Sequence, residues 1–77
     1  MNASQKKAYR KQLQTILEEA KQEVPSDQIL HRVSAARKEG DRMYWDVEVR
    51  VINADDDYDS GWYWFNNFGV GPRGRAL

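Results

Sequence analysis

The sequence predicts an α+β fold in which an N-terminal helix packs on a small antiparallel sheet, in the order α-β-β-β. Three features indicate this class: a helical repeat of apolar residues near the N-terminus, a strictly alternating segment in the middle, and a short aromatic run after an acidic loop. The chain has 77 residues, enough for one domain that buries about 60% of the surface its unfolded chain exposes. We therefore expect a small core and a narrow margin of stability.

A helix is predicted over residues 4–24, where apolar residues recur with the 3.6-residue period of a one-sided helix. Ser4 is the predicted N-cap, and Pro25 ends the helix because proline disfavours helical geometry at the residue before it. The apolar stripe consists of Tyr9, Leu13, Ile16, Leu17, Ala20 and Val24. We expect this stripe to cover one face of the sheet.

The charges of the predicted helix run against its dipole. Basic residues between Lys6 and Lys11 crowd its start, and Glu18, Glu19 and Glu23 lie near its end, although a helix favours the opposite order. Local helix stability therefore does not explain the arrangement. Two interpretations stay open: a solvated face whose charges find partners within the chain, or a docking surface that is basic at one end and acidic at the other.

Residues 42–53 are predicted to form the central strand. From Trp45 to Val51, apolar and charged residues alternate without interruption, which is the period of a strand with one buried and one solvated face. We expect Trp45 and the valines to face the helix and the charged residues between them to face away.

Residues 27–39 fit either a strand or a helix. The strand interpretation, which we favour, joins them to the central strand through a three-residue loop from Lys38 to Gly40, with the glycine in the left-handed region. The expected opposite pairs are Arg37 with Asp41, Val33 with Trp45, and Ile29 with Val49. The helix interpretation makes Ser26 an N-cap and gives the alternative order α-α-β-β.

Residues 62–65, Trp-Tyr-Trp-Phe, follow an aspartate-rich loop and are predicted to form a third strand. Trp62 and Trp64 are expected to face the helix, and Tyr63 and Phe65 to face away. From Gly69 onward, three glycines, a proline and two arginines predict an irregular segment. The expected organisation is one domain over residues 1–68 and a flexible C-terminal tail over residues 69–77.

The α-β-β-β order and the stretch Glu-Gly-Asp-Arg-Met-Tyr-Trp-Asp-Val-Glu-Val, residues 39–49, resemble the layout of PepSY-like domains. That resemblance implies a helix-on-sheet architecture and a link with protease inhibition. The predicted third strand lacks the Asp-x-x-Thr-Gly turn expected in that family, so we do not assign the chain to it.

Composition narrows the function classes. The 12 basic and 12 acidic residues cancel, so the net charge gives no pull toward nucleic acids or acidic membranes. With no cysteine and one histidine, disulfides, thiolate zinc sites and clusters of imidazoles are excluded. No apolar segment is long enough for a membrane span or a signal peptide, so a soluble cytoplasmic protein is expected.

The acidic loop imitates the start of a calcium-binding loop. Asp55, Asp57 and Asp59 have the spacing of its first ligands, but Ser60 stands where a glycine is required and Asn66 where a glutamate is required. We therefore expect no bound metal. Because no catalytic or nucleotide-binding motif is present either, we expect neither enzyme activity nor a cofactor.

The face of the sheet turned away from the helix is the predicted functional surface. Little of the chain is left to cover aromatic side chains there, and uncovered aromatic patches usually mark binding surfaces. We expect a non-catalytic protein-binding module, such as a small inhibitor, accessory or phage-type regulatory protein, with Tyr63 and Phe65 as apolar anchors. The predicted partner-binding residues are Tyr44, Arg50, Asp55, Asp56, Asp57, Tyr58, Asp59, Tyr63 and Phe65.

Two alternatives use the same sheet. In the first, single-stranded nucleic acid stacks on the strand aromatics while arginines bind its phosphates, although nearby acidic residues lower the expected affinity. The arginines concerned are Arg32, Arg50, Arg73 and Arg75. The second alternative is a homodimer formed through sheet faces or an unpaired strand edge.

Overall fold

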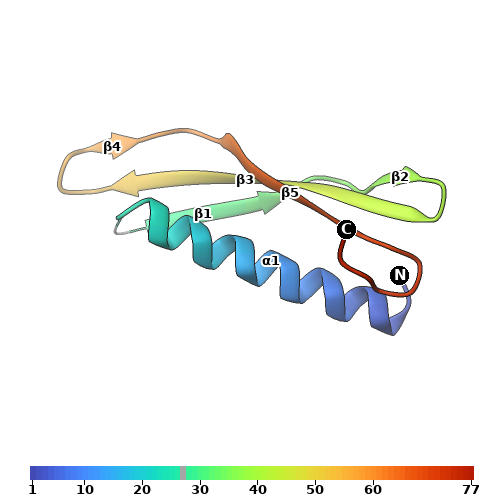
Figure 1. Cartoon of the computed structure of the whole chain (residues 1–77). Helices are drawn as coiled ribbons and strands as arrows, with labels where there is room; N and C mark the ends of the chain where they lie inside the picture. Colours follow the sequence, from blue (N-terminus) through green and yellow to red (C-terminus); the bar gives the residue numbers. More distant parts are fainter. Residues whose placement is uncertain (27) are drawn as a thin grey trace.

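The computed structural model describes residues 1–26 and 28–77; Asp27, at the start of the segment that fits a strand or a helix, lies outside the described residues. Figure 1 shows a helix lying along one face of an elongated antiparallel sheet. The elements are α1 (Ala3–Glu23), β1 (Gln28–Val33), β2 (Arg37–Glu39), β3 (Arg42–Asn53), β4 (Tyr58–Asp59) and β5 (Tyr63–Val70). In the described part of the chain, no helix is both long enough and apolar enough to cross a membrane.

The predicted α+β class is confirmed, and β3 is the central strand. Residues 47–49 pair with both β1 and β5, so these two strands lie on opposite edges of β3. The same reasoning places β2 opposite β5 and β4 opposite β1. Each edge of β3 thus carries one interrupted strand, which corresponds to the predicted α-β-β-β order. The alternative helix over residues 27–39 is wrong, because the described part of this segment contains β1 and β2.

Helix α1 begins one residue earlier than predicted, and its N-cap is Asn2 rather than Ser4. The Asn2 side chain accepts a hydrogen bond from the Gln5 amide at 2.9 Å, and the Gln5 side chain accepts one from the Asn2 amide at 3.0 Å. This reciprocal capping box satisfies two amides that the first turn leaves without helical partners. At the other end the helix stops at Glu23, and Val24 is extended before Pro25, as the proline predicts.

The hairpin between β1, β2 and β3 differs from the predicted one in its turn and its register. Glu39 pairs with Arg42, so the turn has two residues, Gly40 and Asp41, with Gly40 at φ 63°. The predicted pairs are wrong: Ile29 lies opposite Val51, Val33 opposite Val47, and Arg37 opposite Tyr44. In β1 the displacement is two residues, and an even displacement keeps each side chain on its predicted face.

An interruption between β1 and β2 accounts for this change of register. Residues 34–36 lie opposite the two residues 45 and 46, so one residue is extra. Ser34 holds the interruption in place, because its amide donates to the Asp46 carbonyl at 3.0 Å and its hydroxyl accepts from the Asp46 amide at 2.9 Å. A register predicted for an uninterrupted hairpin does not include this hydrogen bond between the Ser34 hydroxyl and the Asp46 amide.

The core lies between α1 and the apolar face of β3. Trp45, Val47, Val49 and Val51 are buried, and the charged residues between them are partly exposed, as the alternation predicts. Ile16 and Phe68 join this core from α1 and β5. The Trp45 ring stacks on Phe68 with centroids 5.2 Å apart, and Tyr9 of α1 meets the Trp45 ring edge-on at 4.8 Å. Aromatic pairs of this kind hold the helix against the sheet.

The predicted faces of the third strand are wrong because β5 contains a bulge. Trp64 pairs with Glu48, whereas Asn66 pairs with Val47, so Phe65 is an extra residue between them. Tyr63 pairs with the buried Val49 and therefore lies on the helix side, and Phe65 packs against the core. Trp64 lies on the face away from the helix, where the sequence predicted Tyr63 and Phe65.

The C-terminal residues pack on the start of α1. Strand β5 continues through Gly69 and Val70, two residues beyond the predicted boundary at residue 68. After a turn, the Leu77 amide donates to the Gly69 carbonyl at 3.1 Å, and the Gln5 side-chain amide donates to the Gly71 carbonyl at 3.2 Å. The predicted mobility of this segment stays a prediction.

Candidate protein-binding surface

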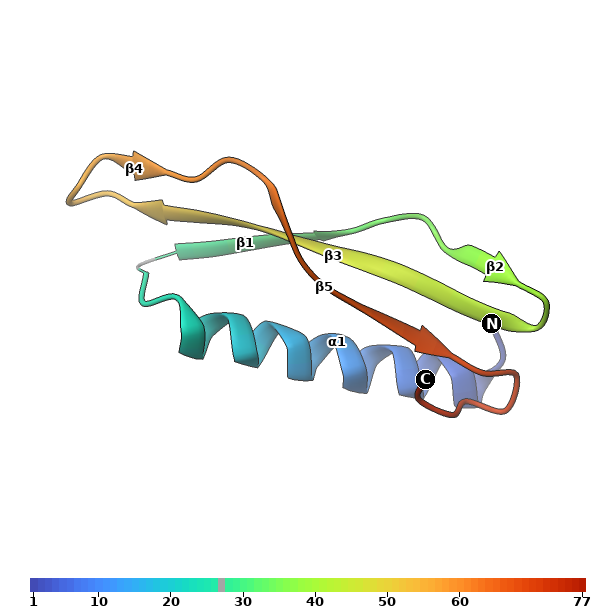
Figure 2. The ribbon, with the colours of Figure 1, turned by 45° about the horizontal axis from the view of Figure 1, so that its top comes forward.

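We call the face of the sheet opposite α1 the open face, because no described element covers it; α1 lies on the other side of the sheet (Figure 2). The pairing of the strands determines which side chains lie on the open face, because directly opposed residues in neighbouring strands share a face. The open face contains charged residues from β1 to β4 and aromatic residues beside β5. Its members include Arg32, Arg37, Tyr44, Asp46, Glu48, Arg50, Asp59, Trp62 and Trp64.

Two tryptophans give the open face its aromatic area, in addition to the apolar side chains of Leu30 and Ile52 on the same face. The Trp64 side chain is 56% exposed, although its indole N–H donates to Asp46 Oδ1 at 3.1 Å. Trp62 is partly buried, and the guanidinium carbon of Arg32 lies 4.5 Å from its ring centroid. This cation–π contact and the indole hydrogen bond orient both rings before any partner arrives. Less ordering is then needed on binding, which favours affinity.

Ion pairs surround the tryptophans. Arg32 Nε lies 2.8 Å from Glu48 Oε1, and Arg37 Nη2 lies 3.6 Å from Asp46 Oδ1. Their side chains are 30% to 57% exposed, so solvent screens both pairs and they add little to stability. Pairs of this kind can exchange partners at low cost, which suits them to orienting an incoming surface.

A third ion pair joins Arg50 of β3 to Asp59 of β4. The Arg50 side chain, followed by the Gly61 amide at 2.9 Å, lowers the pKa of Asp59 from 3.8 to about 2. In return, the hydrogen bond that Arg50 donates to Asp59 raises the pKa of Arg50 above its ordinary value. Both groups are therefore charged at neutral pH, and β4 is attached to β3 by an ionised pair.

Tyr44 forms the other end of the open face. Its ring lies over Gly69 of β5, where an added Cβ would come within 2.6 Å of Tyr44 Cδ1. The glycine allows the ring to lie flat across the neighbouring strand. Tyr44 is partly buried in consequence, and it presents an edge of its ring rather than a projecting anchor.

The structure separates the predicted site residues into three groups. Tyr44 and Arg50 lie on the open face, as predicted, and Asp59 lies on the same face, where it pairs with Arg50. Tyr63 lies on the helix side and Phe65 packs against the core, so their predicted place on the open face is wrong. The remaining residues lie at or beside the β3–β4 turn, away from the tryptophans. These residues are Asp55, Asp56, Asp57 and Tyr58.

The alternate aspartates do not converge as calcium ligands do. Asp59 is directed to Arg50, and Asp57 has a left-handed φ of 51° at the turn. In residues 1–26 and 28–77, no three acidic or histidine side chains come together in a group suited to a metal ion.

The predicted protein-binding residues did not include Trp62, Trp64 or Arg32: the tryptophans were expected to face the helix, and Arg32 was named only for the nucleic-acid alternative. One feature of the sequence pointed to the tryptophans. An indole N–H in a small domain needs a hydrogen-bond acceptor, and Asp46, next to the core residue Trp45, offers a carboxylate on the charged face of the central strand. Comparison of the chain with family models, with curated proteins and with solved structures found no match. The PepSY-like layout therefore has no support beyond the stretch that suggested it, and function must be argued from the open face itself.

Proposed function

We propose that this chain is a non-catalytic protein-binding module that engages a protein partner through the open face. The observation that supports this most strongly is Trp64, which is 56% exposed on the open face and whose indole N–H donates a hydrogen bond to Asp46. Tryptophan, tyrosine and arginine are the residues most enriched among interface hot spots. An inhibitory or accessory role, in which the chain acts by occupying a surface of its partner, fits this arrangement.

The roles within the proposed interface follow from exposure and charge. Trp64 is the projecting anchor, and Trp62 with the stacked Arg32 forms a broader apolar area beside it. The surrounding ion pairs determine orientation, because opposite charges on the partner can replace either member of a pair. The preferred partner surface therefore has an apolar pocket for one indole ring and charged groups of both signs around it.

Protein is favoured over nucleic acid because the arginines of the open face are already neutralised. Arg32, Arg37 and Arg50 each contact a carboxylate, and phosphate would have to displace that carboxylate while meeting its repulsion. Arg73 and Arg75, the other arginines of the nucleic-acid alternative, lie in the C-terminal turn beside the start of α1.

The test compares a double variant, W62A/W64A, with a matched control, Y63A. Tyr63 lies between the two tryptophans in sequence but on the helix side of the sheet, and it is 37% exposed. A partner captured from the source organism by the wild-type chain is purified and recombined with each variant, and affinity is measured by calorimetry. We expect W62A/W64A to weaken binding by at least about 100-fold, as loss of two hot spots does, and Y63A to weaken it less than about fivefold.

The opposite ranking would contradict the proposal. If Y63A abolishes binding while W62A/W64A retains it, the helix side of β5 is the interface. If both variants bind as the wild type does, the interface lies away from β5 altogether. Cooperative thermal unfolding of each variant, followed by circular dichroism, establishes that any loss of binding is not a loss of fold.

A further inference from the structure

Most of the charges outside the open face divide between the two ends of the molecule; Lys38 of β2 and Asp41 of the β2–β3 turn belong to neither set. One end, formed by the start of α1 and the C-terminal turn, is basic and carries Lys6, Lys7, Arg10, Lys11, Arg73 and Arg75. The other end, formed by the last turns of α1 and the β3–β4 turn, is acidic and carries Glu18, Glu19, Glu23, Asp55, Asp56 and Asp57. Lys21 lies among these acidic residues. The sequence predicted such a division for the helix, and the fold adds three charged groups from the β3–β4 turn and two from the C-terminal turn.

Packing holds each set together. At the basic end, the Asn2 side chain donates to the Pro72 carbonyl at 3.2 Å, and an added Cβ on Gly74 would lie 2.6 Å from the Ser4 carbonyl. At the acidic end, the Ser26 hydroxyl donates to the Ile52 carbonyl at 2.9 Å. The molecule is 45 Å long, and Figure 1 shows the two ends far apart. Opposite charges at this separation cannot pair within one molecule.

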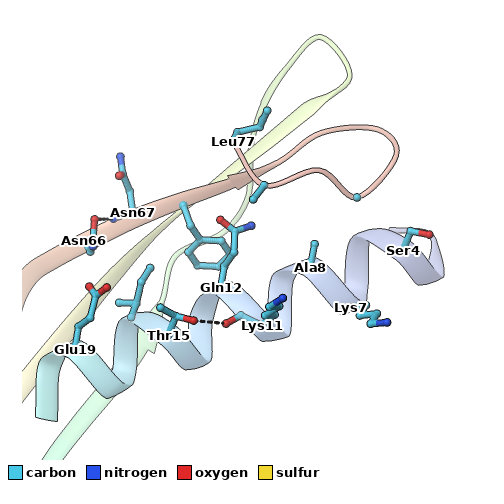
Figure 3. A pocket seen from close by; sticks show the side chains of 14 residues that line it. Ser4, Lys7, Ala8, Lys11, Gln12, Thr15, Glu19, Asn66, Asn67 and Leu77 are labelled. Atoms are coloured by element: carbon cyan, nitrogen blue, oxygen red, sulfur yellow. Dashed lines mark hydrogen bonds between the residues drawn. The ribbon is translucent and has the colours of Figure 1, made fainter.

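An open groove of about 590 Å³ begins at the basic end and runs along α1 as far as Glu19, between α1 and β5. Its apolar lining includes Ile16, Phe68 and Leu77. Its helix side carries Lys7 and Lys11 near the start of α1, and Glu19 two turns farther along the helix. Figure 3 shows the two lysines on successive turns of the helix and Leu77 on the opposite side of the groove. A groove with an apolar floor and a lysine rim suits an acidic segment with one large apolar side chain.

The β3–β4 turn is such a segment. It reads Asp55-Asp56-Asp57-Tyr58, and the Tyr58 side chain is 51% exposed. Its aspartates are opposite in charge to the lysines of the groove. Its tyrosine can bury the ring while the hydroxyl stays solvated. The turn therefore has the chemistry that the groove accepts, but it lies at the far end of the same chain.

We infer that this protein assembles head to tail, with the Asp55–Tyr58 turn of one copy seated in the groove of the next. Tyr58 enters the apolar part of the groove, and Asp55 and Asp56 pair with Lys7 and Lys11. The two surfaces differ, so the contact is heterologous and each added copy leaves one free groove and one free turn. The expected product is an open, polar chain of molecules, not a closed dimer. This contact is separate from the open face and holds whether or not the open face binds a partner.

Sedimentation of the purified protein tests the inference. We expect the average mass to rise with concentration, with a dissociation constant of about 0.1 to 1 mM, the weak range of interfaces that bury less than about 1,200 Å². The association should be strongest at about 10 mM salt, where the Debye length is about 30 Å, and should disappear near 1 M, where it is about 3 Å. A wild-type protein that stays monomeric at about 1 mM and low salt overturns the inference.

Two variants that each block one end give the sharper test. K7E/K11E reverses the lysines of the groove, and D56K/Y58A removes the charge and the anchor of the turn. Each variant alone should associate at least about tenfold more weakly than the wild type. Mixed together, the two should form a heterodimer and nothing larger, because the mixture contains one intact groove and one intact turn per pair.

A matched control and a second readout keep the result specific. K6E/R10E makes the same change of charge on the same helix turns, at residues that do not line the groove, and should weaken association less than K7E/K11E does. In amide spectra of the wild type, raising the concentration should move signals of the groove and the turn and leave the indole signals of Trp62 and Trp64 in place. Equal weakening by both helix variants, a mixture without heterodimer, or movement of the indole signals instead of the groove signals would each refute the head-to-tail contact.

Discussion

Replacement of Gly69 by alanine should destabilise the fold by crowding Tyr44. An ideal Cβ at this position lies 2.6 Å from Tyr44 Cδ1 and 2.7 Å from Cε1, well inside normal carbon–carbon contact at about 3.5 to 4.0 Å. The ring must move by about 1 Å, and overpacking of this kind costs about 1 to 3 kcal/mol. Tyr44 is partly exposed and can move aside, so we expect about 1 to 2 kcal/mol, which lowers the melting temperature of a domain this size by about 5 to 15 °C.

Two further variants isolate the cause. Gly71 is also buried, but a Cβ there meets its nearest atoms at 3.7 to 3.8 Å, so G71A should change stability by less than about 0.5 kcal/mol. In a Y44A background the crowding is gone, and G69A should cost at least about 1 kcal/mol less than in the wild type, a coupling typical of residues in contact. Urea unfolding followed by circular dichroism measures the free energy of unfolding of the wild type, G69A, G71A, Y44A and Y44A/G69A. If G69A is as mild as G71A, or equally costly with and without Tyr44, the pairing of Gly69 with Tyr44 is wrong.

Two other perturbations follow from single contacts. N2A removes the capping box and should destabilise the fold by about 1 kcal/mol, whereas S4A should have little effect; thermal melts that rank the two the other way would contradict the assignment of the cap. Asp59 should titrate near pH 2 because Arg50 lowers its pKa from 3.8. Since the folded pKa lies below the unfolded one, the pair stabilises the fold above pH 3.8 and the stabilisation is lost as the pH falls toward 2. Carbon-detected titration should find the Asp59 midpoint near 2 in the wild type and closer to 3.8 in R50A, where only the Gly61 amide still lowers the pKa, and equal midpoints would refute the contact.

The helix and the central strand could be predicted because each depends on a local period. Alternation from Trp45 to Val51 identifies β3 and its buried face without knowledge of any neighbour. The apolar stripe of α1 is an equally local pattern. The packing of this stripe on the sheet follows because the helix and the sheet each have an apolar surface to bury. The cap was misplaced by two residues because Asn2 and Ser4 are both good capping residues.

The register and the face of β5 could not be predicted because each depends on one extra residue. Without a bulge, Trp64 would share a face with Phe68 and Val70, since all three are separated by even numbers of residues. The bulge at Phe65 reverses that phase and moves both tryptophans to the open face. On the other edge of β3, the interruption that Ser34 holds in place also inserts one extra residue and changes the register. Bulges leave little trace in a local pattern, so the sequence placed Tyr63 and Phe65 on the face that Trp62 and Trp64 occupy.

The central claim, that Trp64 rather than Tyr63 or Phe65 lies on the open face, can be tested directly by NMR. We predict cross-strand proton contacts between Trp64 and Glu48 and between Tyr63 and Val49, together with contacts from the Phe65 ring to core residues. The Trp64 indole proton should exchange rapidly with solvent and shift when Asp46 is replaced by asparagine. Contacts from the Trp64 ring to Tyr9 or Leu13 of α1 would instead place it in the core, and the account of the open face would then be wrong.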